Sequence, residues 1–89
     1  MTTAAPPDGP GEAEIARVLE TLARRRGAGR SFCPSEAARA LTPEDWRGLM
    51  PEVRRVAADL QRAGRLQATQ KGRPVDPDTA RGPIRLGLP

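Results

Sequence analysis

The sequence predicts an α+β domain, mainly α, of the winged helix-turn-helix type, with three helices and a short antiparallel sheet of two or three strands. Three observations lead to this prediction. Apolar residues recur at the spacing of one helical face in three stretches that glycine or proline bounds. After the third stretch the pattern changes to short alternating runs around a Lys-Gly turn. The 89 residues leave room for one small domain.

The first helix is expected to begin at Glu12 and to end before Gly27. Its apolar face consists of Ile15, Val18, Leu19 and Leu22. The acidic first turn and the arginines at 24–26 suit the two ends of the helix dipole. The dipole is therefore a simpler explanation of the arginine triplet than a contact with nucleic acid.

The second helix is expected over residues 34–41, after a short apolar strand stub at 31–33. Pro34 suits the first helical position, where its missing N–H has no partner to lose. Glu36 lies three residues beyond Cys33, which makes Cys33 an unconventional N-cap in a capping box. Because the chain has no histidine and no second cysteine, Cys33 is interpreted as a small hydrophobic residue rather than a reactive thiol.

The third helical region is expected in two pieces. Thr42 is predicted to cap a short helical turn over residues 43–49, with Asp45 completing a capping box. Pro51 lacks the N–H that a continuous helix would bond to the carbonyl four residues earlier. We therefore expect a break just before Pro51, followed by a main helix over residues 51–63.

The main helix has an apolar face and an outward face. The apolar stripe consists of Val53, Val56, Ala57 and Leu60. Placing this stripe inward turns Arg55, Ala58 and Arg62 outward, with Arg54 beside them. The small Ala58 would let this face approach another surface closely. Trp46, which precedes the main helix, is interpreted as a core anchor rather than a platform for stacking bases.

A hairpin is expected after the main helix. Its strands are residues 66–70 and 73–76, joined by a turn at 71–72, and Pro74 restricts the second strand to an edge of the sheet.

The last strand is expected over residues 84–86, which alternate between apolar and polar side chains. Residues 87–89 follow it and are expected to fray. The domain therefore covers residues 12–86. It is preceded by a tail, residues 1–11, that is rich in proline and glycine and expected to be disordered.

The composition excludes several kinds of site. The chain has no histidine, no tyrosine and one cysteine, so the usual proton-transfer, zinc and disulfide constellations cannot be built from it. No catalytic residue, cofactor or metal is therefore expected, and an enzyme is the least favoured class. The chain also lacks a basic, apolar leader and any long apolar run, which predicts a cytoplasmic protein that does not span a membrane.

Four blocks of the sequence are similar to a known family. They are Cys33-Pro34-Ser35-Glu36-x-Ala38-Arg39-Ala40-Leu41, Trp46-Arg47-x-Leu49-Met50-Pro51-x-Val53-Arg54, Gln70-Lys71-Gly72-x-Pro74-Val75-Asp76-Pro77 and Gly82-Pro83-Ile84-Arg85-Leu86. Through these blocks the chain resembles a family of small bacterial winged-helix domains of unknown function. The resemblance implies the winged-helix fold and assigns no functional residue.

Positive charge is concentrated on the main helix and the hairpin. Between residues 54 and 73, six cations face one carboxylate, Asp59, in a chain whose net charge is +4. The sequence therefore predicts a module that binds double-stranded DNA, such as a transcription regulator, as a monomer or weak homodimer. Arg54, Arg55 and Arg62 are expected in the groove, and Arg65, Lys71 and Arg73 on the phosphate backbone. Ser35 is a further candidate phosphate donor.

Two alternatives remain open. The arginines can form a solvated face, in which Asp59 pairs with Arg55 and Arg62 at helical spacing. The domain can also be a protein-interaction module that does not bind nucleic acid, in which case an exposed apolar patch is expected. The candidate residues for that patch are Leu86, Leu88, and any uncovered face of Trp46 or Met50.

Overall fold

Helix α1 (Glu12–Arg26) begins and ends where its residue pattern predicts. Its buried face consists of Ile15, Leu19 and Ala23.

The structure is a computed structural model that describes residues 10–89. The expected disordered tail, residues 1–11, lies outside the described residues except for its last two positions. Of these two, Gly11 is the N-cap of α1.

Helix α2 (Pro34–Leu41) also starts at its predicted residue. The backbone N–H of Cys33 donates to Glu36 Oε2 at 3.2 Å, and the Glu36 N–H donates to the Cys33 carbonyl at 2.9 Å. The Glu36 N–H also faces the Cys33 side chain, which together with the bond to Glu36 Oε2 completes the predicted capping box. Arg26, at the end of α1, donates to the same carboxylate, and this hydrogen bond lowers the pKa of Glu36 below its usual value. A charged contact thus joins α1 to the first turn of α2.

Helix α3 (Trp46–Arg62) corrects two predictions. The expected break before Pro51 is absent, because this proline lies just beyond the first turn and costs the helix a single hydrogen bond. The predicted capping box at Thr42 is wrong. Thr42 is the C-cap of α2, and Asp45 is the residue that precedes α3. Without the break, α3 is one continuous helix of 17 residues.

The sheet has four antiparallel strands in the order β1-β4-β2-β3, one more than the largest number expected. The strands are β1 (Ser31–Phe32), β2 (Gln67–Gln70), β3 (Arg73–Pro74) and β4 (Arg85–Gly87). The stub β1 counts as a strand because Ser31 pairs with Gly87 of β4, which itself extends one residue beyond the expected end. As Pro74 requires, β3 lies at an edge.

The turn of the β2–β3 hairpin is formed by Lys71 and Gly72, as predicted. Both residues have positive φ, 52° and 81°. This pair of left-handed residues matches the twist of the two flanking strands.

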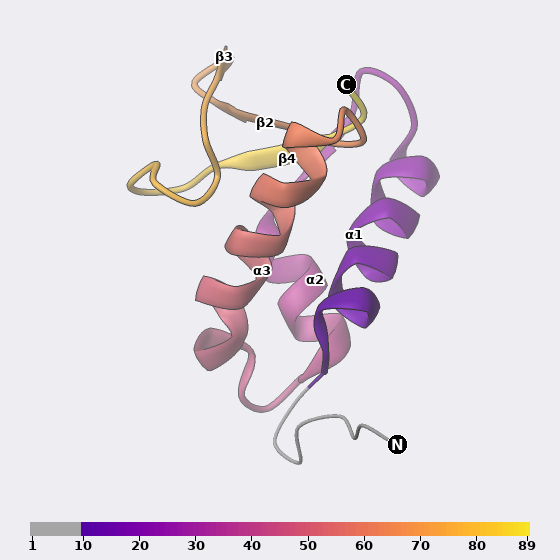
Figure 1. Cartoon of the computed structure of the whole chain (residues 1–89), viewed down its shortest axis with the longest axis vertical. Helices are drawn as coiled ribbons and strands as arrows, with labels where there is room; N and C mark the ends of the chain where they lie inside the picture. The colour runs from indigo at the N-terminus through magenta and orange to yellow at the C-terminus, as the bar shows by residue number, and fades with distance from the viewer. Residues whose placement is uncertain (1–9) are drawn as a thin grey trace.

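The helices pack on one another, and the sheet closes one end of the helical layer (Figure 1). The buried residues form one core to which all three helices, β1, β2 and β4 contribute. Its fully buried large side chains include Phe32, Ile15, Leu19, Leu66, Ile84, Leu86 and Val53. The predicted class, α+β and mainly α, is confirmed, and the arrangement is consistent with a winged-helix layout.

The connection from β3 to β4 crosses helix α3. We call residues 75–83 the strap. Arg54 of α3 donates to the strap carbonyls of Ala80 at 2.7 Å and Gly82 at 2.6 Å. About two turns further along α3, Gln61 Nε2 donates to the carbonyl of Val75 at 2.9 Å. Two side chains of α3 therefore hold the strap against the helix at separate points.

Ala58 lies beneath this crossing and not on an outward face, which corrects the helical-wheel prediction. Residues three and four apart share a side of a helix, so Ala58 is the neighbour of both Arg54 and Gln61. It is 2% exposed, and Pro77 of the strap is fully buried. The helical wheel assigned Ala58 to solvent because periodicity within a helix contains no information about the segment that packs on it.

Candidate nucleic-acid interface

Arg54 is engaged inside the protein. Its guanidinium donates to the two strap carbonyls, which directs the side chain to the strap. The side chain is accordingly a structural link between α3 and the strap.

Arg55 is surrounded by carboxylates. It donates to Glu12 of α1 at 2.6 Å and to Glu52 of its own helix, and Asp59 Oδ2 lies 3.8 Å away. The hydrogen bonds that Arg55 donates to Glu52 and, second in effect, to Glu12 raise the pKa of Arg55 above its usual value. Because Arg62 also pairs with Asp59, two cations meet three carboxylates here, so the local charge is negative and a phosphate approaching Arg55 would be repelled.

Arg62 and Arg65 each have one carboxylate partner. Arg62 donates to Asp59, and Arg65 Nε lies 3.5 Å from Glu20 of α1. Both arginine side chains are more than half exposed, and exposed pairs of this kind contribute only about 0–1 kcal/mol. These two pairs therefore hold their arginines only weakly.

Lys71 and Arg73 are exposed on the hairpin. Neither forms an ion pair with any carboxylate that the structure describes. Arg81 in the strap also lacks such an ion pair, and it lies beside the hairpin, eight residues after Arg73. We call Lys71, Arg73 and Arg81 the wing cluster.

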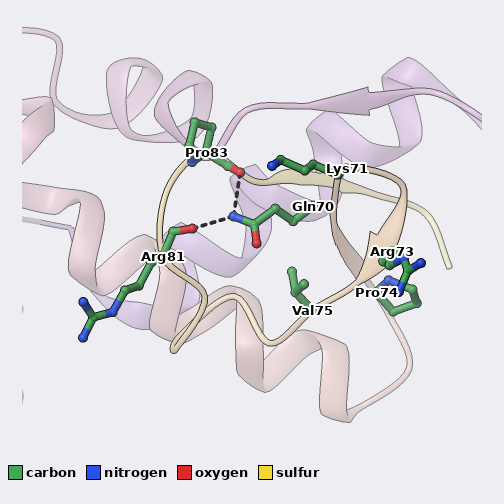
Figure 2. A pocket seen from close by; sticks show the side chains of 7 residues that line it. All are labelled: Gln70, Lys71, Arg73, Pro74, Val75, Arg81 and Pro83. Carbon is green, nitrogen blue, oxygen red and sulfur yellow. Dashed lines mark hydrogen bonds between the residues drawn. The ribbon is translucent and has the colours of Figure 1, made fainter.

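Gln70 ties the two parts of the wing cluster together (Figure 2). Its Nε2 donates to the carbonyl of Arg81 at 2.5 Å and to the carbonyl of Pro83 at 3.1 Å. The end of strand β2 is thereby fixed to the strap, and the wing cluster has a defined frame.

A shallow depression of about 570 Å³ lies within this frame. Its lining consists of Gln70, Lys71, Arg73, Pro74, Val75, Arg81 and Pro83. In Figure 2 the Arg81 side chain extends away from the centre, while Lys71 and Arg73 lie on the opposite side. The depression therefore combines an apolar floor with a basic rim.

Ser35 is not a free phosphate donor in this structure. Its hydroxyl donates to Cys33 Sγ at 3.1 Å, at the start of α2. The predicted donor thus belongs to the local structure around the capping box.

Trp46 is covered on the faces that a base would need. The guanidinium carbon of Arg39 lies 4.4 Å from the ring centroid, and that of Arg47 lies 4.6 Å away. The ring is partly buried and packs against the core. Trp46 therefore packs on the edge of the core and is not one of its buried members.

The predicted cluster is divided because carboxylates remote in sequence meet it in space. Within residues 54–73 the six cations face Asp59 alone, but the fold adds Glu12 and Glu20 from α1, and Glu52 lies just before this range, three residues from Arg55. The residues missed by sequence reasoning are Gln61, Gln70 and Arg81. No pattern in the sequence marks Arg81. Its place beside Gln70 follows from the pairing of β4 with β2, in which Arg85 lies opposite Thr69.

A family described as "Protein of unknown function (DUF3253)" has a model that matches residues 12–89. The chain belongs to this family. The matched range begins at the first residue of α1, so the DUF3253 domain and the folded part of the structure start together. No curated protein matches the chain.

Two further findings concern the DUF3253 domain as the structure describes it. Within residues 10–89, histidine, cysteine and acidic side chains form no group of three that could hold a metal ion. None of the described helices combines the length and the apolar character needed to cross a membrane.

Proposed function

We propose that this domain is a winged-helix module of the cytoplasm that binds nucleic acid, with double-stranded DNA as its main partner, through phosphate contacts of the wing cluster. The observation that supports the proposal is the exposure of Lys71, Arg73 and Arg81 on adjoining segments without a carboxylate partner among the described residues. Cations in this state attract phosphate and release counterions when they bind it.

In the proposed mode of binding, α3 does not read bases. The strap covers the side of the helix around Ala58, and Arg54 and Arg55 are held by carbonyl and carboxylate groups. Direct readout requires side-chain donors that reach base edges in the major groove. Phosphate contacts fix the position of a protein on the duplex but contain no sequence information. We therefore expect binding that depends little on base sequence.

The test is a fluorescence-anisotropy titration of labelled random-sequence duplex DNA at several salt concentrations. Three phosphate contacts predict that the logarithm of the affinity falls with the logarithm of salt concentration at a slope of roughly −3. The double variant Lys71→Gln/Arg73→Gln should bind more weakly and reduce the slope to about −1.

The matched control is Arg17→Gln/Arg24→Gln on helix α1, which removes the same charge from residues that are paired with Glu14 and Glu20. This control should retain the wild-type slope. Equal losses in the two double variants would show that only net charge matters, and salt-insensitive or absent binding by the wild type would end the proposal.

The protein-interaction alternative has less support. Of its candidate apolar residues, Leu86 is fully buried, and Leu88 and Met50 pack against the core. Trp46 is covered by two arginines. The patch that this alternative expects is therefore not assembled from these residues.

A further inference from the structure

The depression in the wing has a floor that phosphate contacts alone do not use. Pro74 lies on the edge strand, and Val75 and Pro83 lie at the two ends of the strap. Most of the lining surface is apolar, and the charged groups lie around it. Ligand sites commonly combine such an apolar surface with a few polar groups that set orientation.

Gln70 places a hydrogen-bond acceptor in the same depression. Because its Nε2 donates to two carbonyl groups, the orientation of the amide is determined, and Oε1 faces the other way. No described residue donates to Oε1, and in Figure 2 this oxygen is directed towards the space in front of Val75. The floor therefore offers one acceptor to a flat ligand that carries an N–H donor.

We propose that this depression holds one unpaired nucleotide, with its base against Pro74, Val75 and Pro83 and its phosphate on Lys71 or Arg73. The proposal rests on the proposed function, because the same basic rim supplies the phosphate contacts. It adds a ligand class: nucleic acid with a single-stranded end next to a duplex.

The chemistry of the base is the reason for choosing an unpaired nucleotide. A base inside a duplex is stacked and paired, so its faces and its Watson–Crick donors are not accessible to a shallow surface site. A base in a single-stranded end exposes both. Such a base can cover the apolar floor while its amino group donates to Gln70 Oε1. Neither the floor nor this acceptor is used when only the phosphates of a duplex are bound.

The experiment compares three labelled DNAs with the same duplex part, using the whole chain. The first is blunt, the second carries a short single-stranded cytidine overhang, and the third carries an overhang of equal length made of abasic sites. The abasic overhang retains the phosphates and lacks only the bases. We expect the cytidine overhang to bind about threefold more tightly than the abasic overhang, less than for a base stacked on an aromatic ring, because the floor contains no aromatic side chain.

A charge-neutral variant tests the floor. Pro74→Ser/Pro83→Ser changes two exposed side chains and leaves every cation in place. It should lose the preference for the cytidine overhang and retain the wild-type affinity for the blunt duplex, with an unchanged unfolding temperature as the check on folding.

The outcomes separate this inference from the proposed function. Equal affinity for the cytidine and abasic overhangs would overturn the nucleotide site while leaving phosphate binding intact. A preference that persists in the serine variant would overturn the assignment to this depression. Absence of salt-dependent binding to all three DNAs would instead refute the proposed function itself.

Discussion

At Gly87 a side chain would collide with the backbone of the neighbouring strand region. A Cβ built on this residue would lie 2.7 Å from the carbonyl oxygen of Arg30. Gly87 pairs with Ser31 on one side and with Gln67 on the other, so the strand cannot move away without loss of pairing. The close approach of β1 to β4 therefore depends on this glycine.

We expect Gly87→Ala to lower the free energy of unfolding by about 1–3 kcal/mol, the usual cost of forcing an extra group into a packed position. Urea denaturation measures the change. The control is Gly48→Ala in the first turn of α3, where the nearest atom is Asp45 Oδ1 at 3.4 Å. Gly48→Ala should instead stabilise the helix by about 0.5–1 kcal/mol. A neutral Gly87→Ala would show that β1 and β4 are less tightly apposed than described.

Thr42 differs in role from what its position in the sequence indicates. Its Oγ1 is buried and has no hydrogen-bond partner among the described residues. Its backbone N–H donates to the Ala38 carbonyl at 2.8 Å, and its own carbonyl accepts from Asp45 at 3.2 Å. Both backbone contacts are independent of the side chain, so the hydroxyl contributes a desolvation cost without a compensating bond.

Thr42→Val should therefore raise the free energy of unfolding by about 1 kcal/mol, since it removes an unsatisfied polar group and keeps the shape. If Thr42 were the helix cap that local sequence predicts, the same change would cost about 1 kcal/mol. Thermal unfolding distinguishes the two signs. Thr42→Ser, which keeps the hydroxyl and loses the methyl group, should be less stable than both the wild type and Thr42→Val.

At the scale of elements, the position of the strap depends on α3. Arg54 and Gln61 hold it to the helix, and Gln61 also accepts from the Ala68 N–H at 2.6 Å, which connects α3 to β2. Gln70 completes the frame from the hairpin side. These hydrogen bonds hold the strap over Ala58 and also fix the residues that line the depression in the wing. One set of contacts therefore covers one side of α3 and shapes the candidate site.

Arg54→Lys should loosen the strap while leaving the rest of the domain folded. A lysine ammonium lacks the fixed fork with which Arg54 reaches two carbonyls, and the loss is expected to be about 1–2 kcal/mol locally. Hydrogen exchange at the Val75 and Ala80 amides measures it, and about tenfold faster exchange per 1.4 kcal/mol is expected. The exposed Arg62→Lys is the control. Unchanged exchange in Arg54→Lys would mean that the fork does not hold the strap.

For the whole molecule, the important quantity is where free positive charge remains after folding. The net charge is +4, but Arg54, Arg55 and Arg62 of α3 are held by strap carbonyls or by Glu12, Glu52 and Asp59, and Arg65 beyond the helix is held by Glu20. Lys71, Arg73 and Arg81 have no carboxylate partner among the described residues, and they line one depression. The other described arginines without a carboxylate partner do not line it; apart from Arg54, they are Arg25, Arg30, Arg39, Arg47 and Arg85. The electrostatic attraction of the domain for phosphate is therefore expected at the wing and not along α3.

Arg55→Gln/Arg62→Gln tests this distribution directly. We expect its affinity for duplex DNA to lie within about twofold of the Arg17→Gln/Arg24→Gln control, because both variants remove paired charges far from the proposed contacts. Lys71→Gln/Arg73→Gln should be clearly weaker than either. If Arg55→Gln/Arg62→Gln lowered the affinity for duplex DNA as much as the wing variant does, the phosphate-binding site would have to be assigned to the outward face of α3.

Much of the fold could be predicted from patterns that span a few residues. The ends of α1, the capping box at Cys33, the Lys71-Gly72 turn and the edge position of Pro74 all follow from hydrogen bonds and φ restrictions within one turn of the chain. The unbroken α3 was missed because the cost of one proline was smaller than the gain from a continuous packed helix.

The candidate site depended on tertiary structure. Arg55 meets Glu12 across 43 residues of sequence, and Arg54 meets Gly82 across 28, because α1 and the strap both pack on α3. Periodicity assigns a side chain to a face of its own helix, but the partner on that face comes from another element. Local order and the identity of the cations could therefore be derived from the chain itself. Which cations stay free for a ligand was decided only when distant carboxylates and carbonyls came within 4 Å of them.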